Sequence, residues 1–537
     1  MLLFRIHKRQ GVAGMNESLK STVTGLLDMP VLCVIDTRSV QKYMFHANEM
    51  EETMGAEVIM QTMAIESIRF AAEHVNPPLS PEECVLSNSD ADGEVAFRTD
   101  GRIKVQVLDA AASNMILAFR TGRLCRDVVR KMARYYLDNS YSLQFSSACA
   151  EWTGDMAADM DSLFRNLGES KRRAFGAHPV MPFSIVRVER NTGEPVALVD
   201  SETGEELSRV SMLRRRCFAR SRGSQWKDRQ VRMLRRPDGR GFYGVAHVDG
   251  NNMGALVVEL SCNSTAGSDP LRNRHALNRS IPGIIRHAIA AATEDVKRRW
   301  GLGDAQAEQA VRVIQLGGDD MNVAASPDVV FFFVERYLAH LSDIPLWEDA
   351  RRKVFMSGCA GIAIVGEGTD YVKAFDYAEE CCERAKDMAK AAHNLVDGRA
   401  GNWLDYCIVY PDRPDDSEAD RNEAYVASDG TGLMLRPYCV DPAFGDAPHG
   451  YGGFRRRVEA LAEMGMDRET VARLMLTCGM GVGEVRLYAN GLAVNGASVV
   501  ERLGEPIVRD RDRNCAAWYD ALELYGFMCQ TDWRISR

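Results

Sequence analysis

The chain has 537 residues, of which 46% are hydrophobic and 26% are charged, and its formal net charge is −9. This length exceeds what one compact core organises, so several domains are expected, and the composition is that of a folded globular protein. The acidic balance excludes a general nucleic-acid-coating protein, and no apolar run reaches the roughly 20 residues that a membrane span needs.

Residues 1–30 are expected to be an N-terminal extension. The start, MLLFRIHKRQ, has only a short apolar tip before its basic residues, so it is a poor signal peptide, and Met15 is an alternative functional start. The 14 cysteines of the chain form no CxxC pair, which is typical of reduced thiols and predicts a cytoplasmic protein.

The first folded block is predicted over 31–150. A strand, VLCVID, is followed by a helical stretch over 39–74 and a proline-rich break. Two further strands near 103–108 and 115–119, a helix over 125–139 and a strand over 142–149 complete the block. This alternation predicts a mixed sheet backed by helices.

Residues 151–240 are predicted to form a connector of short strands that ends in a basic tract. Between Arg214 and Arg240 there are eleven Arg or Lys residues against two Asp, which opposes the overall charge of the chain. Two interpretations remain open: a solvated linker or helix face, or a surface that contacts RNA or nucleotide phosphates.

A second strand-and-helix block is predicted over 241–411. The strand FYGVAHVDG, a helix over 275–300, a hairpin of VRVIQL and MNVAAS, a helix over 329–341, the inner strand VFMSGCAGIAIVG, a helix over 372–392 and a last strand WLDYCIVYP follow in order. This order predicts a ferredoxin-like or palm sheet. Residues 412–453 are predicted to be a linker, and 454–537 a helical C-terminal domain.

The two blocks resemble each other at two points. When the two blocks are aligned, Asp36 of VLCVID corresponds to Asp249 of GVAHVDG, and the AASN of residues 111–114 corresponds to the GGDD of residues 317–320. This suggests a duplicated domain in which only the second copy keeps its carboxylates, although chance similarity remains open.

The second block carries three carboxylates at predicted strand ends. Asp249 ends one strand, while Asp319 and Asp320 occupy a hairpin tip with Gly317 and Gly318. Three adjacent acids need a compensating cation, and hard oxygen ligands select Mg²⁺ or Mn²⁺, which also bind nucleoside triphosphates. Glycine supplies the positive φ of a tight turn and lets a triphosphate approach the backbone. A solvent-exposed turn explains the hairpin residues but not Asp249.

Four segments of this block carry a family resemblance. HVDGNNMG, IQLGGDDMN, SGCAGIAIV and AFDYAEECCERAKDMAK follow in this order. They resemble the second palm of the large subunit of type III CRISPR effector complexes, a distant relative of the diguanylate cyclases. The resemblance covers about 240–411, is weaker over 31–150 and is only architectural for the C-terminus.

The resemblance implies an α+β fold with two ferredoxin-like palm domains, an α/β connector and a helical C-terminal domain. The first palm is degenerate and the second has the GGDD hairpin. In that family the palm polymerises ATP into cyclic oligoadenylate messengers when the complex binds target RNA. It therefore implies a two-metal, Mg²⁺- or Mn²⁺-dependent nucleotidyl cyclase with ATP as substrate, acting in antiviral defence. Guide or target RNA and other CRISPR effector subunits are the implied partners, with no membrane and an oligomeric state that the sequence leaves open.

The resemblance also assigns roles to residues of this chain. The implied metal ligands, three of them catalytic, are Asp249, Asp319, Asp320 and the main-chain carbonyl of Gly250. The implied nucleotide-binding residues are Asn251, Asn252, Gly317, Gly318 and Lys386. An exposed helix lysine remains an alternative for Lys386, and turn or helix-capping residues for the two asparagines. Ser357 and the small residues after it are expected to permit close packing of the inner strand.

The chain departs from the family in two respects. It has no His-Asp dipeptide and no room before residue 31 for a nuclease domain, so DNA cleavage by that route is not expected. No CxxC lies between 150 and 240, so the zinc site common in that region is doubtful. A reduced CRISPR subunit and a relative working outside a CRISPR complex both remain open.

Three other functions are alternatives. Diguanylate cyclases carry Glu-Phe where this chain has Asp320-Met321 and act as symmetric homodimers. RNA-dependent polymerases have a second Asp where this chain has Gly254. The third is a non-catalytic, RNA-binding scaffold, against which the intact Asp249, Asp319 and Asp320 count, because a purely structural copy could lose them.

Overall fold

The structure is a computed structural model in which most of the chain is described. The described residues are 27–45, 50–86, 96–110, 114–173, 185–201, 203–222, 241–262, 270–349, 352–366, 368–391, 400–410, 425–441, 448–494 and 497–530. The predicted N-terminal extension therefore lies almost entirely outside the described residues. Among these residues, no helix combines the length and the apolar composition that crossing a bilayer requires.

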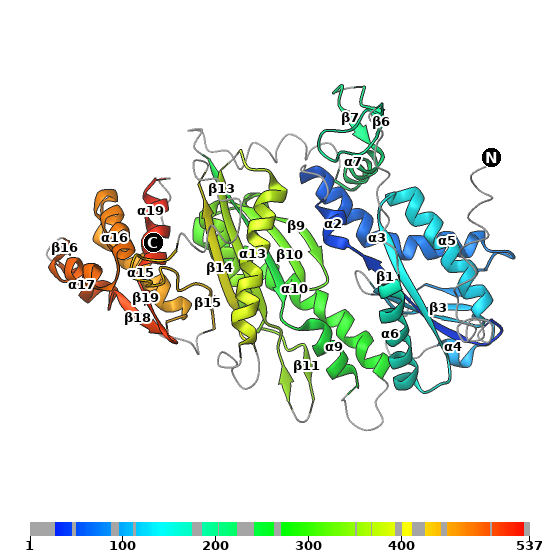
Figure 1. The fold of residues 1–537 in the computed structure, drawn as a ribbon. Helices are drawn as coiled ribbons and strands as arrows, with labels where there is room; N and C mark the ends of the chain where they lie inside the picture. Colours follow the sequence, from blue (N-terminus) through cyan, green and yellow to red (C-terminus); the bar gives the residue numbers. More distant parts are fainter. Residues whose placement is uncertain are drawn as a thin grey trace. The chain divides into compact units, whose positions relative to one another are not determined.

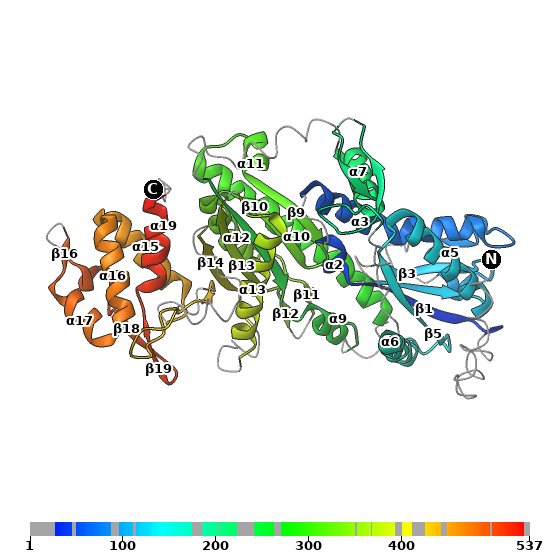
Figure 2. The ribbon, with the colours of Figure 1, turned by 45° about the horizontal axis from the view of Figure 1, so that its top comes forward.

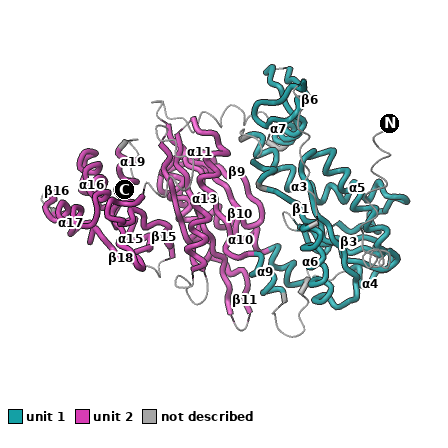
Figure 3. The backbone as a smooth tube through the Cα atoms, viewed as in Figure 1, with its two compact units in different colours: residues 1–47, 51–221, 254–279 teal, residues 48–50, 222–253, 280–537 magenta. Residues whose placement is uncertain are grey.

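The chain forms two compact units (Figure 3). Unit 1 comprises residues 1–47, 51–221 and 254–279, and unit 2 comprises 48–50, 222–253 and 280–537. Each unit contains one main sheet, so the fold is α+β, as predicted.

The strands of the two main sheets are best given in chain order. Those of unit 1 are β1 (Val31–Arg38), β2 (Cys84–Val85), β3 (Val105–Ala110), β4 (Asn114–Phe119) and β5 (Gln144–Glu151). Those of unit 2 are β8 (Phe242–Gly250), β9 (Val311–Gly317), β10 (Asp320–Ala325), β13 (Gly358–Gly366), β14 (Trp403–Val409) and β15 (Tyr438–Cys439). The orders are β2-β3-β4-β1-β5 in the first sheet and β15-β14-β13-β8-β10-β9 in the second.

The helices that accompany the sheets are mostly longer than the predicted ones. Up to the second sheet they are α2 (Val40–Met44), α3 (Met50–His74), α4 (Ala96–Thr99), α5 (Gly122–Ser140), α6 (Met156–Arg173), α7 (Arg209–Arg222), α9 (Met253–Cys262) and α10 (Pro270–Trp300). Within and after it they are α11 (Asp304–Ala310), α12 (Pro327–His340), α13 (Tyr371–Lys390), α15 (Tyr451–Met464), α16 (Arg468–Met480), α17 (Val482–Gly491), α18 (Val499–Leu503) and α19 (Tyr519–Gln530). Small two-stranded sheets pair β6 (Val196–Val199) with β7 (Glu206–Ser208), β11 (Trp347–Glu348) with β12 (Lys353–Val354), β16 (Ala493–Val494) with β17 (Ala497–Ser498), and β18 (Ile507–Asp510) with β19 (Arg513–Ala516).

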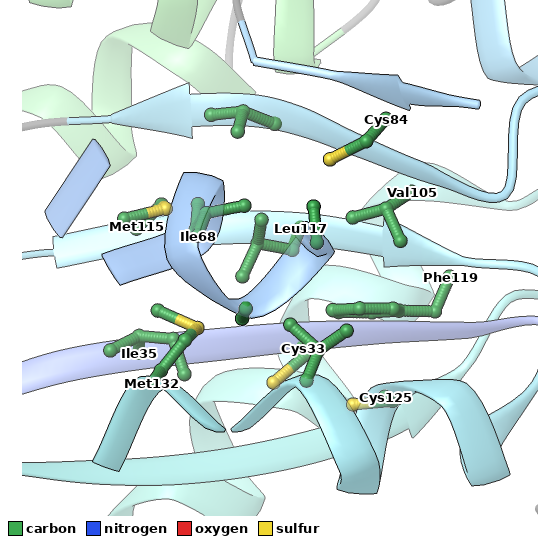
Figure 4. Close-up of a cluster of buried hydrophobic side chains, with 14 of the residues drawn as sticks. Cys33, Ile35, Ile68, Cys84, Val105, Met115, Leu117, Phe119, Cys125 and Met132 are labelled. Atoms are coloured by element: carbon green, nitrogen blue, oxygen red, sulfur yellow. The ribbon is translucent and has the colours of Figure 1, made fainter. Parts of the chain in front are cut away.

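The first sheet is covered by helices on both faces. Because side chains alternate along a strand, Cys33 and Ile35 of β1 face one side, where α3 and α5 supply Ile68 and Met132 (Figure 4). Leu32 and Val34 face the other side and pack against α6, among others through Leu163. Helix α6 lies in the segment predicted as connector, but it packs on β1 and β5 and therefore belongs with the first sheet.

The second sheet has the same layering. Strand β13 is buried along its whole length and lies between β8 and β14, with α13 along these strands (Figure 1). A Cβ at Gly361 would lie 2.0 Å from the carbonyl oxygen of Ala378 in α13, so only glycine fits there. On the other face, a Cβ at Gly244 would meet Val330 of α12. The close packing expected of the inner strand is thus present and is due to glycine.

The two sheets share one connectivity. In each, a central strand, one or more helices, a hairpin, a further helix and the strand on the other side of the central strand follow in the order β-α-β-β-α-β. The order β5-β1-β4-β3 in the first sheet corresponds to β13-β8-β10-β9 in the second. Asp36 pairs in register with Asn114 of the hairpin, and Val248 pairs with Met321, so Asp249 and Asp320 occupy the equivalent places. These equivalences agree with the duplication suggested by the sequence.

The segment predicted as linker differs from that prediction where it is described. Residues 438–439 form β15 at the edge of the second sheet. Arg436 is buried and pairs with Asp520 at 3.0 Å and with Glu523 at 2.5 Å, both in α19. Polar composition suggested a linker, but these buried ion pairs hold the segment between the sheet and the C-terminal helices. Helices α15, α16, α17 and α19 are gathered in one group (Figure 2).

The basic tract is described only at its start. Residues 209–222 form α7, and 223–240 lie outside the described residues. Arg214 is fully buried and donates to the carbonyl of Tyr43, while Arg215 pairs with Glu52 at 2.8 Å. These two arginines therefore stabilise unit 1 and are not available to phosphates.

Candidate active site

Three carboxylates meet at one end of the second sheet. Asp249 lies near the end of β8, and Asp319 and Asp320 lie at the β9–β10 hairpin next to it. Strand alternation places Asp249 on the same face as His247, whose ring packs against Phe375 of α13. The site is therefore positioned by the central strand, one hairpin and one helix.

The hairpin is as tight as the sequence predicts. Asp320 pairs with Gly317, which leaves Gly318 and Asp319 as a two-residue loop. Gly318 has a φ of 68°, a conformation that side chains disfavour and that glycine adopts readily. A Cβ at Gly250 would lie 2.9 Å from Oδ2 of Asp319, so the backbone of β8 comes close to the hairpin tip.

The carboxylates converge, and a lysine joins them. One oxygen of each of Asp249, Asp319 and Asp320 lies within 4.8 Å of the others. Nζ of Lys386 in α13 lies 2.5 Å from Oδ2 of Asp249 and 2.9 Å from Oε1 of Glu383. Lys386 is therefore not a freely solvated helix lysine.

The protonation of the three acids follows from burial and crowding. Burial, helped by the charge of Asp249, raises the pKa of Asp319 to about 6. Burial and contact with Asp249 hold the pKa of Asp320 well above its usual range. Burial also acts on Asp249, but its hydrogen bond with Asp320 and the Lys386 ammonium lower the pKa of that carboxyl. One ammonium does not balance three carboxylates, so without another cation the cluster retains protons.

This donor set fits a hard divalent cation. The three carboxylates offer closely spaced oxygens, and Mg²⁺ or Mn²⁺ prefers such ligands. The raised pKa values of Asp319 and Asp320 record an excess of negative charge that a bound cation would relieve. The Gly250 carbonyl as a further ligand stays a prediction.

The two asparagines after β8 have different surroundings. Nδ2 of Asn251 donates to Oγ of Ser357 at 3.1 Å and to the carbonyl of Gly401 at 2.9 Å, so this amide joins the starts of β13 and β14. Asn252 is exposed and has a φ of 52°, which suits a turn between strand and helix. Their predicted role in nucleotide binding stays a prediction, and Asn251 has a clear structural role as well.

A buried polar chain beneath the carboxylates was not foreseen. His247 Nδ1 lies 2.7 Å from Oδ1 of Asn322, whose Nδ2 donates to Gln315 at 2.5 Å. Burial lowers the pKa of His247, so this imidazole is neutral, and its Nδ1–H donates a hydrogen bond to Oδ1 of Asn322. These three side chains link β8, β10 and β9, and His247 and Asn322 each stand two residues from an acid, Asp249 and Asp320 respectively. The signal was the alternation of polar residues with Asp249 and Asp320 along otherwise apolar strands.

A second unforeseen feature is a matching pair in the first sheet. Nζ of Lys171 in α6 lies 2.7 Å from Oδ2 of Asp36. Lys171 is as far from the start of α6 as Lys386 is from the start of α13. Continuing the internal comparison of the sequence past the hairpin into the next helix would have found this lysine.

This chain is similar to known proteins in its three-dimensional structure but has no match by sequence. No protein-family model matches the chain, and no curated protein sequence matches it. Among solved structures, the Csm1–Csm4 cassette in complex with cA4 is 12% identical, with a TM-score of 0.46, over 94% of this chain and 70% of that chain. The cassette in complex with AMPPNP is 13% identical, with a TM-score of 0.44, over 95% and 72%. Csm1 of T. onnurineus is 12% identical, with a TM-score of 0.43, over 94% and 70%.

Proposed function

We propose that this chain is a Mg²⁺- or Mn²⁺-dependent nucleotidyltransferase whose second sheet is a catalytic palm and whose first sheet is a degenerate palm. The observation that carries the proposal is the convergence of Asp249, Asp319 and Asp320 within 4.8 Å at adjacent strand ends. A solvent-exposed turn would explain Asp319 and Asp320, but it would not explain a third carboxylate from another strand or the partial burial of all three.

The three carboxylates and the carbonyl of Gly250 would hold the divalent cations. When bound, such a pair of cations lowers the pKa of an attacking ribose 3′-hydroxyl and neutralises the charge that develops on the leaving pyrophosphate. The reaction joins the 3′-oxygen to an α-phosphorus and breaks the bond from that phosphorus to the oxygen that leaves with pyrophosphate.

Residues of the chain contribute besides the acids. Lys386 holds Asp249 ionised and brings a positive charge next to the place of a triphosphate. Gly317 and Gly318 have no side chains to separate phosphate oxygens from the backbone. Because Asp319 and Asp320 retain protons in the absence of cations, occupation of the site is expected to release protons.

The substrate and partners are proposed from the motifs. The order of HVDGNNMG, IQLGGDDMN and SGCAGIAIV favours ATP as substrate and a cyclic oligoadenylate as product. The same resemblance favours action within a type III CRISPR-like effector complex that contains RNA.

The test is direct analysis of reaction products. Purified protein is incubated with labelled ATP or GTP and Mn²⁺, with and without candidate RNA, and the products are identified by mass spectrometry. We expect 3′–5′ linked products and pyrophosphate from the wild type, and none from the double variant Asp319→Ala, Asp320→Ala. Glu308→Ala, which removes an exposed acid on α11, is the matched control. Equal product from the double variant would show that the assigned site is wrong.

A further inference from the structure

Three cysteine thiols meet inside the first sheet, away from the candidate active site. Cys33 of β1 pairs in register with Cys149 of β5, so their side chains lie on the same face. Cys125 lies near the start of α5, which covers this face, and Figure 4 shows its sulfur close to that of Cys33. We call Cys33, Cys125 and Cys149 the thiol group.

The sulfur atoms of the thiol group have the spacing of ligands that share an ion. Sγ of Cys125 lies 3.4 Å from Sγ of Cys149, and all three sulfurs lie within 4.8 Å of one another. Two thiolates on one tetrahedral zinc ion, each at about 2.3 Å, lie about 3.8 Å apart. Shifts of less than about 1 Å would therefore bring all three sulfurs onto a common ion.

The packing of the fold does not require these thiols. Cys33 stands three residues before Asp36, and the equivalent residue before Asp249 is Ala246. Ala246 pairs with Ile362 in the second sheet as Cys33 pairs with Cys149 in the first. The same sheet position is thus filled by aliphatic side chains in one copy and by two thiols in the other, with a third thiol delivered by the covering helix.

The surroundings favour a soft cation that enters from one side. Cys33 and Cys125 are buried, and Cys149 is partly exposed, which provides a route for an ion. In the described part of the chain, no fourth histidine, cysteine or carboxylate joins the three sulfurs. Three thiolates alone suit Cu⁺, and three thiolates with a solvent ligand at Cys149 suit Zn²⁺.

We propose that the thiol group binds one thiophilic cation, Zn²⁺ or Cu⁺, and so ties β1, β5 and α5 together. The bound ion replaces the protons of the thiols, which are released to solvent, and no electron transfer is involved. This site is independent of the divalent cations proposed for the carboxylates, because its ligands are soft sulfur atoms and theirs are hard oxygen atoms.

The test is a metal titration of the full chain. Protein is reduced, freed of metal by chelation and titrated without oxygen in two arms, one with Cd²⁺ as a spectroscopic substitute for Zn²⁺ and one with Cu⁺, each against a competing chelator. Charge-transfer absorption of thiolate–metal bonds reports binding. Cys33→Ala and Cys149→Ala each remove one ligand. Alanine is the residue that the second sheet has at the position equivalent to Cys33, namely Ala246. The matched control is Cys84→Ala, a buried thiol of the same core outside the thiol group.

We expect one tight equivalent in the wild type and in Cys84→Ala. Loss of an outer partner of a metal ligand already weakens binding about 10- to 100-fold, so loss of a ligand should weaken it more than about 100-fold. A tight first equivalent in the Cd²⁺ arm identifies a zinc-type site, and one in the Cu⁺ arm alone identifies a copper site. If neither arm has a first equivalent that depends on Cys33 and Cys149, the proposal is overturned.

A second measurement does not depend on variants that fold. Wild-type protein is alkylated with and without the tightest-binding ion, and the modified cysteines are mapped by mass spectrometry. Selective protection of Cys33, Cys125 and Cys149 supports the site, with the partly exposed Cys217 and Cys529 as internal controls. Protection that is absent, or equal at the control cysteines, contradicts it.

Discussion

The two sheets have equivalent sites at the ends of their central strands β1 and β8, and the two sites differ in their number of carboxylates. In both, a lysine pairs with the aspartate of the central strand, and this lysine comes from the helix that follows the neighbouring strand. Lys386 of α13, after β13, pairs with Asp249, and Lys171 of α6, after β5, pairs with Asp36. The residue opposite that aspartate is Asn114 in the first hairpin, whereas Asp319 and Asp320 stand in the second.

The difference shows what the hairpin acids add. In the first sheet one ammonium meets one carboxylate, and the pair is balanced without any ion. In the second sheet one ammonium meets three carboxylates, and the pKa values of Asp319 and Asp320 rise. The lysine–aspartate pair is thus common to both sheets, and the hairpin acids create the need for further cations.

The largest expected effect separates the two aspartates. Asp249→Asn should lower product formation at least about 10³-fold, because cations at such a site contribute several kcal/mol to the transition state. Asp36→Asn changes the same atoms in the balanced pair and should remain within about tenfold of the wild type. Steady-state rates with ATP and Mn²⁺ measure both. Equal losses would mean that the two sheets do not differ in role.

The two lysines should differ by less. Lys386→Met removes a charge-assisted hydrogen bond to Asp249, which we propose as a catalytic carboxylate; the bond is worth about 1.5–3 kcal/mol, so the rate should fall about 10- to 100-fold. Lys171→Met is the matched control, and its lysine is more exposed, at 45% against 15% for Lys386. Comparable rates for Lys386→Met and the wild type would remove Lys386 from the site.

One glycine distinguishes the packing of the two sheets. Gly361 faces α13, and the equivalent position of β5 in the first sheet is Ala148. Gly361→Ala should destabilise the second unit by about 1–3 kcal/mol, because the added methyl overlaps the backbone of α13. Chemical denaturation measures the change. Gly368→Ala, where a Cβ meets no atom within 4 Å, should have little effect, and a similar loss there would contradict the packing argument.

The smallest expected effect is on the pH dependence of thermal stability in the absence of metal ions. The pKa of Asp319 is about 6 in the folded protein and near 3.8 when unfolded, so the folded state binds more protons between these values. The stabilising contribution of this proton is therefore complete below about pH 3.8 and lost as pH rises through about 6. In a chelator, the Tm should fall by a few degrees between pH 5 and pH 7. Asp319→Asn should flatten this dependence, and Asp36→Asn should leave it unchanged. A Tm that rises over this range in the wild type would contradict the assignment.

The strand ends of the second sheet could be predicted because their signals are local. Asp249 follows an apolar strand, and the paired glycines and aspartates of the hairpin announce a tight turn. Gly318 has the positive φ that the turn needs, and the three carboxylates meet. The small residues of β13 likewise predicted close packing, which Gly361 explains.

Other features were missed because their partners are distant in sequence. The segment around Arg436 looked like a linker, yet Asp520 lies 84 residues away and makes its charge compatible with burial. The segment that forms α6 falls within the predicted connector, and its packing on β1 and β5 shows that it belongs with the first sheet. The thiol group contains no CxxC, since its three cysteines come from two strands and a helix.

The sequence by itself determined the α+β character, the order along the chain of most strands and helices of the two sheets and the identity of the carboxylates, because hydrophobic period and turn chemistry act over a few residues. Only the tertiary structure decided which side chains pair across the sheets: Lys386 with Asp249, Lys171 with Asp36, and Cys33 with Cys149. The physical reason is that burial and Coulomb interactions depend on distance in space. A charge or a thiol acquires its chemistry from neighbours that the chain supplies from far along its length.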